Sequence, residues 1–260
     1  MKKTNSKDGS HSRPLLMAHL IAGYPDLATS LEIAKALVEG GAQMLELQMP
    51  SSDPAADGPA IQAACTQALD RGLRLDHGFE LAKRIVEATK VPLYIMAYAC
   101  QIYARGIKRF VDDSSKAGAA GIIAPDLPVG EDEGLYAACA QSGLDCVPVI
   151  PITAPQKRVE EIMAAARPAR WVYTALRAGI TGSQTKLTSE AMALLEDIRQ
   201  RGARTIAGFG ISSKGQIELL AGHSDAVVAG TFFVRTIAKA QLEGEAPTTA
   251  VRIAAEKLLS

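Results

Sequence analysis

Short apolar runs alternate with longer amphipathic segments along this chain of 260 residues. The apolar runs have the length and composition of buried strands, and the segments between them carry apolar residues at helical spacing. Strands are predicted at Leu15–Ala22, Met44–Gln48, Pro92–Tyr98, Gly121–Ala124, Cys146–Ile150, Trp171–Ala175, Thr205–Gly208 and Asp225–Ala229. Helices are predicted at Ser30–Glu39, Ala60–Asp70, Asp76–Ala88, Ile107–Ala117, Gly134–Ser142, Gln156–Ala166, Ser189–Arg201, Ser213–Ala221 and near the C-terminus.

This alternation is typical of an α/β fold with a parallel sheet. Eight strand–helix pairs favour a single (β/α)8 TIM barrel, because an open doubly wound sheet usually stops at five or six strands. Glycines recur at the helix-to-strand junctions, at Gly40-Gly41, Gly118 and Gly143, where a left-handed residue ends a helix. No linker divides the chain, so we expect a polar tail over residues 1–14 and one barrel domain over residues 15–260.

Composition narrows the classes of function. Apolar residues make up 48% of the chain, and its 28 basic and 28 acidic residues give a formal net charge of zero. This balance argues against nucleic acid or an acidic membrane as the main partner. The four cysteines form no Cys-x-x-Cys pair and no metal-ligand spacing. With a polar N-terminus and no apolar run of about 18 residues, we expect a soluble cytoplasmic protein without a metal site.

The first candidate for chemistry is Glu46, in the second predicted strand. Strand alternation places it opposite Leu45 and Leu47, and these leucines suit the helix-facing side. Glu46 is therefore directed into the barrel mouth, where burial makes a carboxylate a candidate general acid or base. The alternative is a buried glutamate that only forms an ion pair. A second carboxylate, Asp57, follows in a loop of small residues, where it is equally able to act as a turn or capping residue.

A phosphate site is predicted at the ends of strands 7 and 8. Gly208-Phe209-Gly210-Ile211-Ser212 and Ala229-Gly230-Thr231 stand at these two consecutive strand ends. Glycines there let backbone N–H groups approach an anion, as they do in many barrels of this type. We favour a phosphate site over ordinary turn glycines, because two consecutive strand ends carry these glycines.

Together these motifs resemble the tryptophan synthase α subunit from Leu15 to Ala240. The long string Ser52-Asp53-Pro54-Ala55-Ala56-Asp57-Gly58-Pro59 is the most specific part of the resemblance. Ala22-Gly23-Tyr24-Pro25-Asp26 resembles the family's first turn, and Arg177-Ala178-Gly179-Ile180-Thr181-Gly182 resembles its mobile lid.

The resemblance implies cofactor-independent cleavage of indole-3-glycerol phosphate to indole and glyceraldehyde 3-phosphate. It implies that Glu46 is the acid/base and that Asp57 accepts a hydrogen bond from the indole N–H. It further implies that Tyr173 lines the pocket and that Thr181 orients Asp57 when the lid closes. The residues implied to hold the phosphate are Gly182, Gly210, Gly230 and Thr231.

Several positions depart from the family pattern. Gln48 stands where the family usually has Gly, and its amide is expected either to enter the indole pocket or to bond the catalytic carboxylate. His19 replaces an aromatic residue of strand 1, where a histidine is more often a packed, hydrogen-bonded residue than a catalyst. Ser51 replaces a Phe, and Cys100-Gln101 stands where Asn-Pro is typical, on a loop that faces the family's β partner.

Four functions remain open at this stage. The first is an active lyase working as the α subunit of an α2β2-type heteromer with a β subunit. The others are a stand-alone lyase that releases indole, a weakly active ligand-binding or regulatory subunit, and a different phosphate-binding barrel such as a sugar-phosphate epimerase. The last is least favoured, because it does not explain the Asp57 loop.

Overall fold

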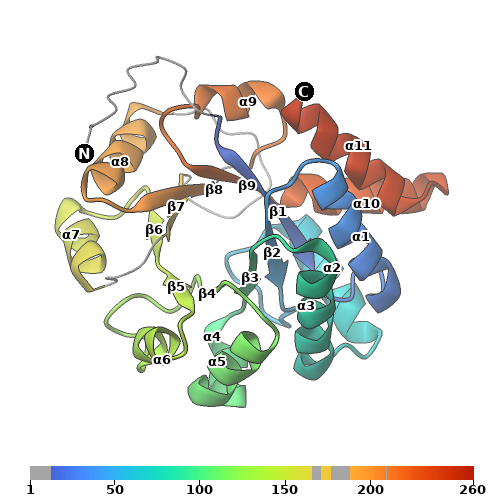
Figure 1. Cartoon of the computed structure of the whole chain (residues 1–260), viewed down its shortest axis with the longest axis horizontal. Coiled ribbons are helices and arrows are strands. Elements are labelled where there is room, and N and C mark those ends of the chain that lie inside the picture. Colours follow the sequence, from blue (N-terminus) through green and yellow to red (C-terminus); the bar gives the residue numbers. More distant parts are fainter. Residues whose placement is uncertain (1–12, 166–170, 177–187, 209) are drawn as a thin grey trace, which may run out of the picture.

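The computed structural model describes residues 13–165, 171–176, 188–208 and 210–260, in which parallel strands form a ring with helices around it (Figure 1). The strands are β1 (Leu15–Ile21), β2 (Met44–Gln48), β3 (Leu93–Met96), β4 (Gly121–Ile123), β5 (Asp145–Val147), β6 (Val149–Pro151), β7 (Trp171–Ala175), β8 (Arg204–Gly208) and β9 (Ala226–Ala229). The helices are α1 (Leu27–Glu39), α2 (Pro59–Asp70), α3 (Leu75–Thr89), α4 (Ala99–Arg105), α5 (Ile107–Lys116), α6 (Leu135–Gln141), α7 (Gln156–Ala165), α8 (Ser189–Gln200), α9 (Lys214–Leu219), α10 (Thr231–Glu243) and α11 (Pro247–Leu259). In this part of the chain, no helix has the length and apolar character that crossing a bilayer requires.

The two end strands of the sheet meet at Pro148, where the barrel closes. The hydrogen-bonded order is β5-β4-β3-β2-β1-β9-β8-β7-β6, and its two end strands are separated in the chain by this one residue. Proline has no N–H to donate to a strand ladder, although its carbonyl oxygen accepts a hydrogen bond from the Tyr173 N–H at 2.9 Å. The single strand predicted over Cys146–Ile150 is therefore two short strands, of which β5 pairs with β4 and β6 pairs with β7. With this correction, the predicted barrel is confirmed.

Side chains on the strands alternate between the inside of the barrel and the surrounding helices. On β2, Leu45 and Leu47 belong to the core between strands and helices, whereas Met44 belongs to a second apolar cluster inside the barrel. Glu46 and Gln48 face the same side of the strand as Met44 and lie closer to its carboxyl end. The predicted inward direction of Glu46 follows from this alternation.

Two helical regions differ from the sequence prediction. Helix α4 occupies the segment expected as a loop around Cys100-Gln101, and Gly106, with a φ of 83°, separates it from α5. The single C-terminal helix is two helices, because Gly244 ends α10 in the left-handed region and Pro247 begins α11.

The junction glycines serve two purposes. Gly41, Gly118 and Gly143 have φ values of 102°, 78° and 71°, which confirms the left-handed residues predicted there. Gly40 instead allows a close approach, because a Cβ on it would lie 2.6 Å from the Arg252 carbonyl oxygen. Gly40 thus permits α11 to pack against the end of α1, two helices that also lie side by side in Figure 1.

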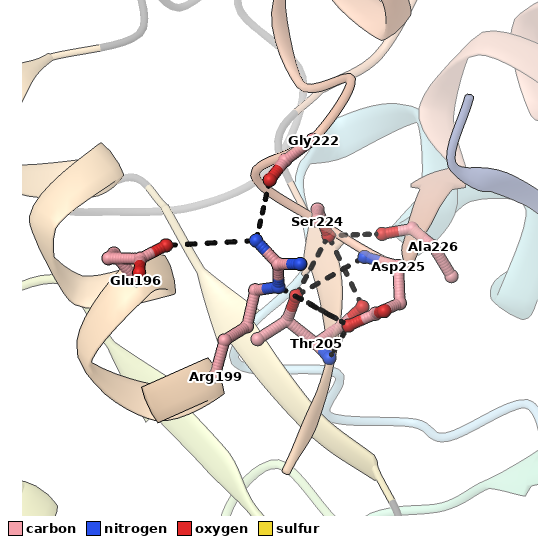
Figure 2. A network of polar contacts seen from close by, with 7 residues as sticks. All are labelled: Glu196, Arg199, Thr205, Gly222, Ser224, Asp225 and Ala226. Atoms are coloured by element: carbon pink, nitrogen blue, oxygen red, sulfur yellow. Dashed lines mark hydrogen bonds and ion pairs between the residues drawn. The ribbon is translucent and has the colours of Figure 1, made fainter. Parts of the chain in front are cut away.

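A polar network holds the amino ends of β8 and β9, at the end of the barrel opposite the strand carboxyl ends (Figure 2). The Thr205 N–H donates to Asp225 Oδ2 at 2.9 Å, and the Arg199 guanidinium lies 4.0 Å from the same oxygen. The Ser224 hydroxyl lies 2.7 Å from the Ala226 carbonyl oxygen and 3.2 Å from that of Thr205. These contacts fix the loop that leads into β9, and this end of such barrels commonly serves stability.

Replacing Ser224 with Ala should lower the free energy of unfolding by about 1–3 kcal/mol, because buried carbonyl groups lose a partner. Urea denaturation of the purified chain measures this change. The matched control is Ser115→Ala on the exposed side of α5, which should alter stability by no more than about 0.5 kcal/mol. Equal midpoints for both variants would contradict a stabilising network.

Candidate active site

Glu46 lies beside a histidine inside the barrel. In the parallel register of β1 and β2, His19 is directly across from Glu46, and each residue is 4% exposed. His19 Nδ1 lies 3.3 Å from Glu46 Oε2. A carboxylate that loses its hydration needs an opposite charge or donors nearby. The imidazole meets that need, so the predicted acid/base is a carboxylate–imidazole pair.

The protonation of His19 follows from this pairing. Burial by itself lowers the pKa of His19, but the nearby charge of Glu46, with a further contribution from Asp57, raises it above its ordinary value. The pair therefore holds a proton at neutral pH more readily than an isolated histidine would.

Among the described residues, Asp57 is held by two side-chain donors. It lies in the loop between β2 and α2 and is 4% exposed. Its Oδ2 accepts hydrogen bonds from Gln48 Nε2 and from the Tyr98 hydroxyl, both at 2.7 Å. Burial raises the pKa of Asp57, while these two donors and the charge of His19 oppose the rise. The N-cap of α2 is Gly58, so the capping alternative for Asp57 is wrong.

Gln48 forms a hydrogen bond with Asp57 and not with Glu46. Of the two outcomes expected for its amide, the structure has the hydrogen bond, and the acceptor is Asp57. The same Nε2 lies 3.6 Å from Cys65 Sγ. The glutamine that replaces the usual glycine therefore fixes the carboxylate of the loop.

Three buried polar atoms of this region have no hydrogen-bond partner among the described residues. They are His19 Nε2, Glu46 Oε2 and Gln48 Oε1, all on β1 and β2. His19 Nδ1 lies 3.3 Å from Glu46 Oε2, a contact that becomes an ion pair when the imidazole is protonated, but its geometry is not that of a hydrogen bond. Each unsatisfied group of this kind costs about 1–3 kcal/mol, and such groups are rare in folded proteins. Their concentration inside the barrel indicates a binding place for a polar ligand.

Tyr173 covers the end of β8 from the neighbouring strand β7. A Cβ on Gly208 would lie 2.4 Å from its ring and hydroxyl, so the ring occupies the space that this glycine leaves open. Burial, together with the charges of Glu46 and Asp57, raises the pKa of Tyr173 well above its ordinary value. Its hydroxyl therefore stays neutral close to both carboxylates.

The predicted phosphate-binding residues that the structure describes lie at the N-termini of two helices. At α9, the Ser212 and Ser213 N–H groups already donate to Gln216 Oε1, at 2.8 and 3.1 Å, and Gly210 precedes them with a φ of 65°. At α10, Gly230 is the N-cap and Thr231 the first residue, and no described side chain caps this start. A helix of 13 residues with free N–H groups favours an anion there.

Two residues of the predicted site, Thr181 and Gly182, lie outside the described residues. Within those residues, no three His, Cys, Asp or Glu side chains are grouped as metal ligands. Tyr98 was not predicted as a site residue, although its position at the end of the third predicted strand was an available signal. Gln216, the N3 residue of a capping box at Ser213, was not predicted either.

Comparisons with known proteins agree on one family. Residues 6–259 match the family model described as tryptophan synthase alpha chain. Relatives of that name include one from Synechococcus elongatus, 38% identical over 91% of this chain and 89% of its own. Another, from Acaryochloris marina, is 36% identical over 86% and 84%.

Solved structures agree with this assignment. The tryptophan synthase of Mycobacterium tuberculosis is 27% identical with a TM-score of 0.84, covering 95% of this chain and 92% of that one. A mutant tryptophan synthase alpha-subunit from Pyrococcus furiosus is 28% identical with a TM-score of 0.83, covering 94% and 97%. The barrel and these matches together place the chain in the tryptophan synthase alpha chain family.

Proposed function

We propose that this chain cleaves indole-3-glycerol phosphate to indole and glyceraldehyde 3-phosphate by a retro-aldol reaction, without a cofactor, in tryptophan biosynthesis. The observation that carries the proposal is the pair of buried carboxylates in different surroundings. Glu46 has an imidazole beside it, whereas Asp57 accepts two hydrogen bonds from neutral donors. Two carboxyl groups in such different environments are suited to different protonation states and tasks.

The chemistry needs a proton moved from oxygen to carbon. Glu46 delivers a proton to C3 of the indole ring, which places positive charge on the ring nitrogen. The hydroxyl on the adjacent side-chain carbon loses its proton to the same acid/base group. The bond between that carbon and C3 then breaks, its electron pair returns to the ring, and an aldehyde forms. Asp57 stabilises the positive charge by accepting a hydrogen bond from the ring N–H.

The remaining residues bind and orient the substrate. The N-terminus of α10, with Gly230 and Thr231, receives the phosphate, and Gly210 borders it from the neighbouring loop. Tyr173 lines the indole pocket with a neutral ring. The tasks of Thr181 and Gly182 remain predictions from the family resemblance.

Glu46→Gln should lower indole release by roughly 10²–10⁴-fold, because the amide keeps the shape but cannot exchange a proton. A colorimetric assay for indole measures this loss, and calorimetry with glycerol 3-phosphate should show unchanged binding. The control Glu80→Gln, on the exposed side of α3, should keep the full rate. Most of the activity remaining in Glu46→Gln would exclude the acid/base assignment. A wild-type chain that is silent with and without a partner would favour the ligand-binding alternative.

Gln48→Ala should reduce kcat/KM by roughly tenfold or more, because Asp57 loses one of its charge-assisted hydrogen bonds. That donor lowers the pKa of Asp57, so its loss should raise this pKa and move the acid limb of the pH–rate profile to higher pH. Gln141→Ala, at an exposed position of α6, serves as the control. A faster variant would instead mean that the amide obstructs the indole pocket.

We also propose that the chain works as the α subunit of an α2β2-type complex with a tryptophan synthase β subunit. The support is a hollow of about 370 Å³ beside the loop that follows β2, lined by Met49, Pro50, Ser51, Cys100, Gln101 and neighbouring residues. Gln101 Nε2 donates to the Pro50 carbonyl oxygen at 2.8 Å, so α4 is tied to the loop that carries Asp57. A partner seated on this hollow has a direct route to that carboxylate.

Adding the β subunit of the same organism should raise the rate of indole formation at least tenfold, because contact with the hollow acts through Gln101 on the loop that carries Asp57. Stopped assays with and without the partner, beside a sizing column on the mixture, measure rate and assembly together. The variant Gln101→Ala should weaken the stimulation while leaving the basal rate within twofold. Full activity alone, with no co-elution, would identify a stand-alone lyase.

A further inference from the structure

Among the described residues, one ring nitrogen of His19 lies near a carboxylate and the other has no hydrogen-bond partner. Nδ1 lies 3.3 Å from Glu46 Oε2, while Nε2 is buried without a hydrogen-bond partner among the described residues. A histidine kept only for packing would be expected to have both nitrogens satisfied or exposed. The free nitrogen therefore needs an explanation that packing does not supply.

The ring also has a defined second neighbour. A Cβ placed on Gly230 would lie 3.5 Å from both Cγ and Cδ2 of the His19 ring, and Cδ2 is the ring carbon bonded to Nε2. Gly230 is the N-cap of α10, the predicted phosphate position. The imidazole thus lies between the acid/base carboxylate, which is near Nδ1, and the start of α10, which faces the Cγ–Cδ2 bond of the ring.

The substrate has matching chemistry between the same two points. In indole-3-glycerol phosphate, two hydroxyl-bearing carbons join the indole ring to the phosphate-bearing carbon. With the indole at Glu46 and the phosphate at α10, these hydroxyl groups are the part of the molecule that meets His19.

We propose that His19 is a substrate-binding residue whose Nε2 donates a hydrogen bond to a hydroxyl oxygen of the glycerol chain, while its Nδ1 edge positions Glu46. This inference rests on the proposed function for the identity of the ligand. The raised pKa of His19, which Glu46 and Asp57 cause against the effect of burial, favours the imidazolium form, in which both nitrogens carry a proton. Selectivity for a hydroxylated phosphate ester over a plain one is then built into β1.

The test compares three unreactive probes by calorimetry: glycerol 3-phosphate, propyl phosphate and inorganic phosphate. The wild-type chain should bind glycerol 3-phosphate about tenfold more tightly than propyl phosphate, which has the same chain length without hydroxyls. His19→Phe and His19→Leu should abolish that preference and leave propyl phosphate binding within twofold. His19→Gln, which restores an amide donor, should recover part of the preference.

The controls separate binding from folding and from the proposed reaction. The control variant is His223→Gln, which should keep the full preference because His223 lies next to the network at the opposite end of the barrel. Thermal melts identify any variant that fails to fold. A wild-type chain with no preference for the hydroxylated probe, or an apolar variant that keeps it, would overturn the assignment of His19. None of these probes is cleaved, so the result stands whether or not indole-3-glycerol phosphate proves to be the substrate.

Discussion

The proposed active site depends on the pairing of β1 with β2, which sets an imidazole beside a buried carboxylate. Glu46 is 4% exposed, and a charge so far from water is tolerated only with a partner close by. The partner comes from the adjacent strand in direct register, not from a flexible loop. A slip of one residue in that register would turn either side chain toward the helices, so the sheet itself enforces the pair.

The two carboxylates are held by different means, and this difference gives them different chemistry. Glu46 is fixed by its strand and has a group beside it that can also carry a proton. Asp57 is fixed by side chains from β2 and from the segment after β3, and both donors stabilise its charged form. A buried carboxylate with an imidazole beside it and a second carboxylate held by two donors suit the two tasks that the proposed protonation of an indole ring requires.

The sequence was sufficient for features that repeat along the chain and insufficient for features that arise from particular contacts. Strand alternation predicted the inward direction of Glu46, and the glycine junctions predicted the left-handed residues. The break at Pro148 was visible as a proline, but its effect depends on which strands flank it in space. Nothing local indicated that Gln48 bonds Asp57, because the two meet only after the loop folds back over the barrel. Gly208 was interpreted as part of an anion loop, and the structure adds that its missing side chain leaves room for the Tyr173 ring.

The two ends of the barrel differ in how completely their polar groups are satisfied. At the amino ends of β8 and β9, Ser224, Thr205 and Asp225 bond one another and the backbone (Figure 2). Toward the carboxyl ends, three buried side-chain atoms of the described residues are left without a hydrogen bond. Unsatisfied groups lower stability, so a fold that tolerates them needs compensation elsewhere, and the opposite network is one place where it is found. Ligand binding at the unsatisfied end would recover the lost hydrogen bonds, which converts a defect in the free protein into affinity and selectivity for a polar substrate.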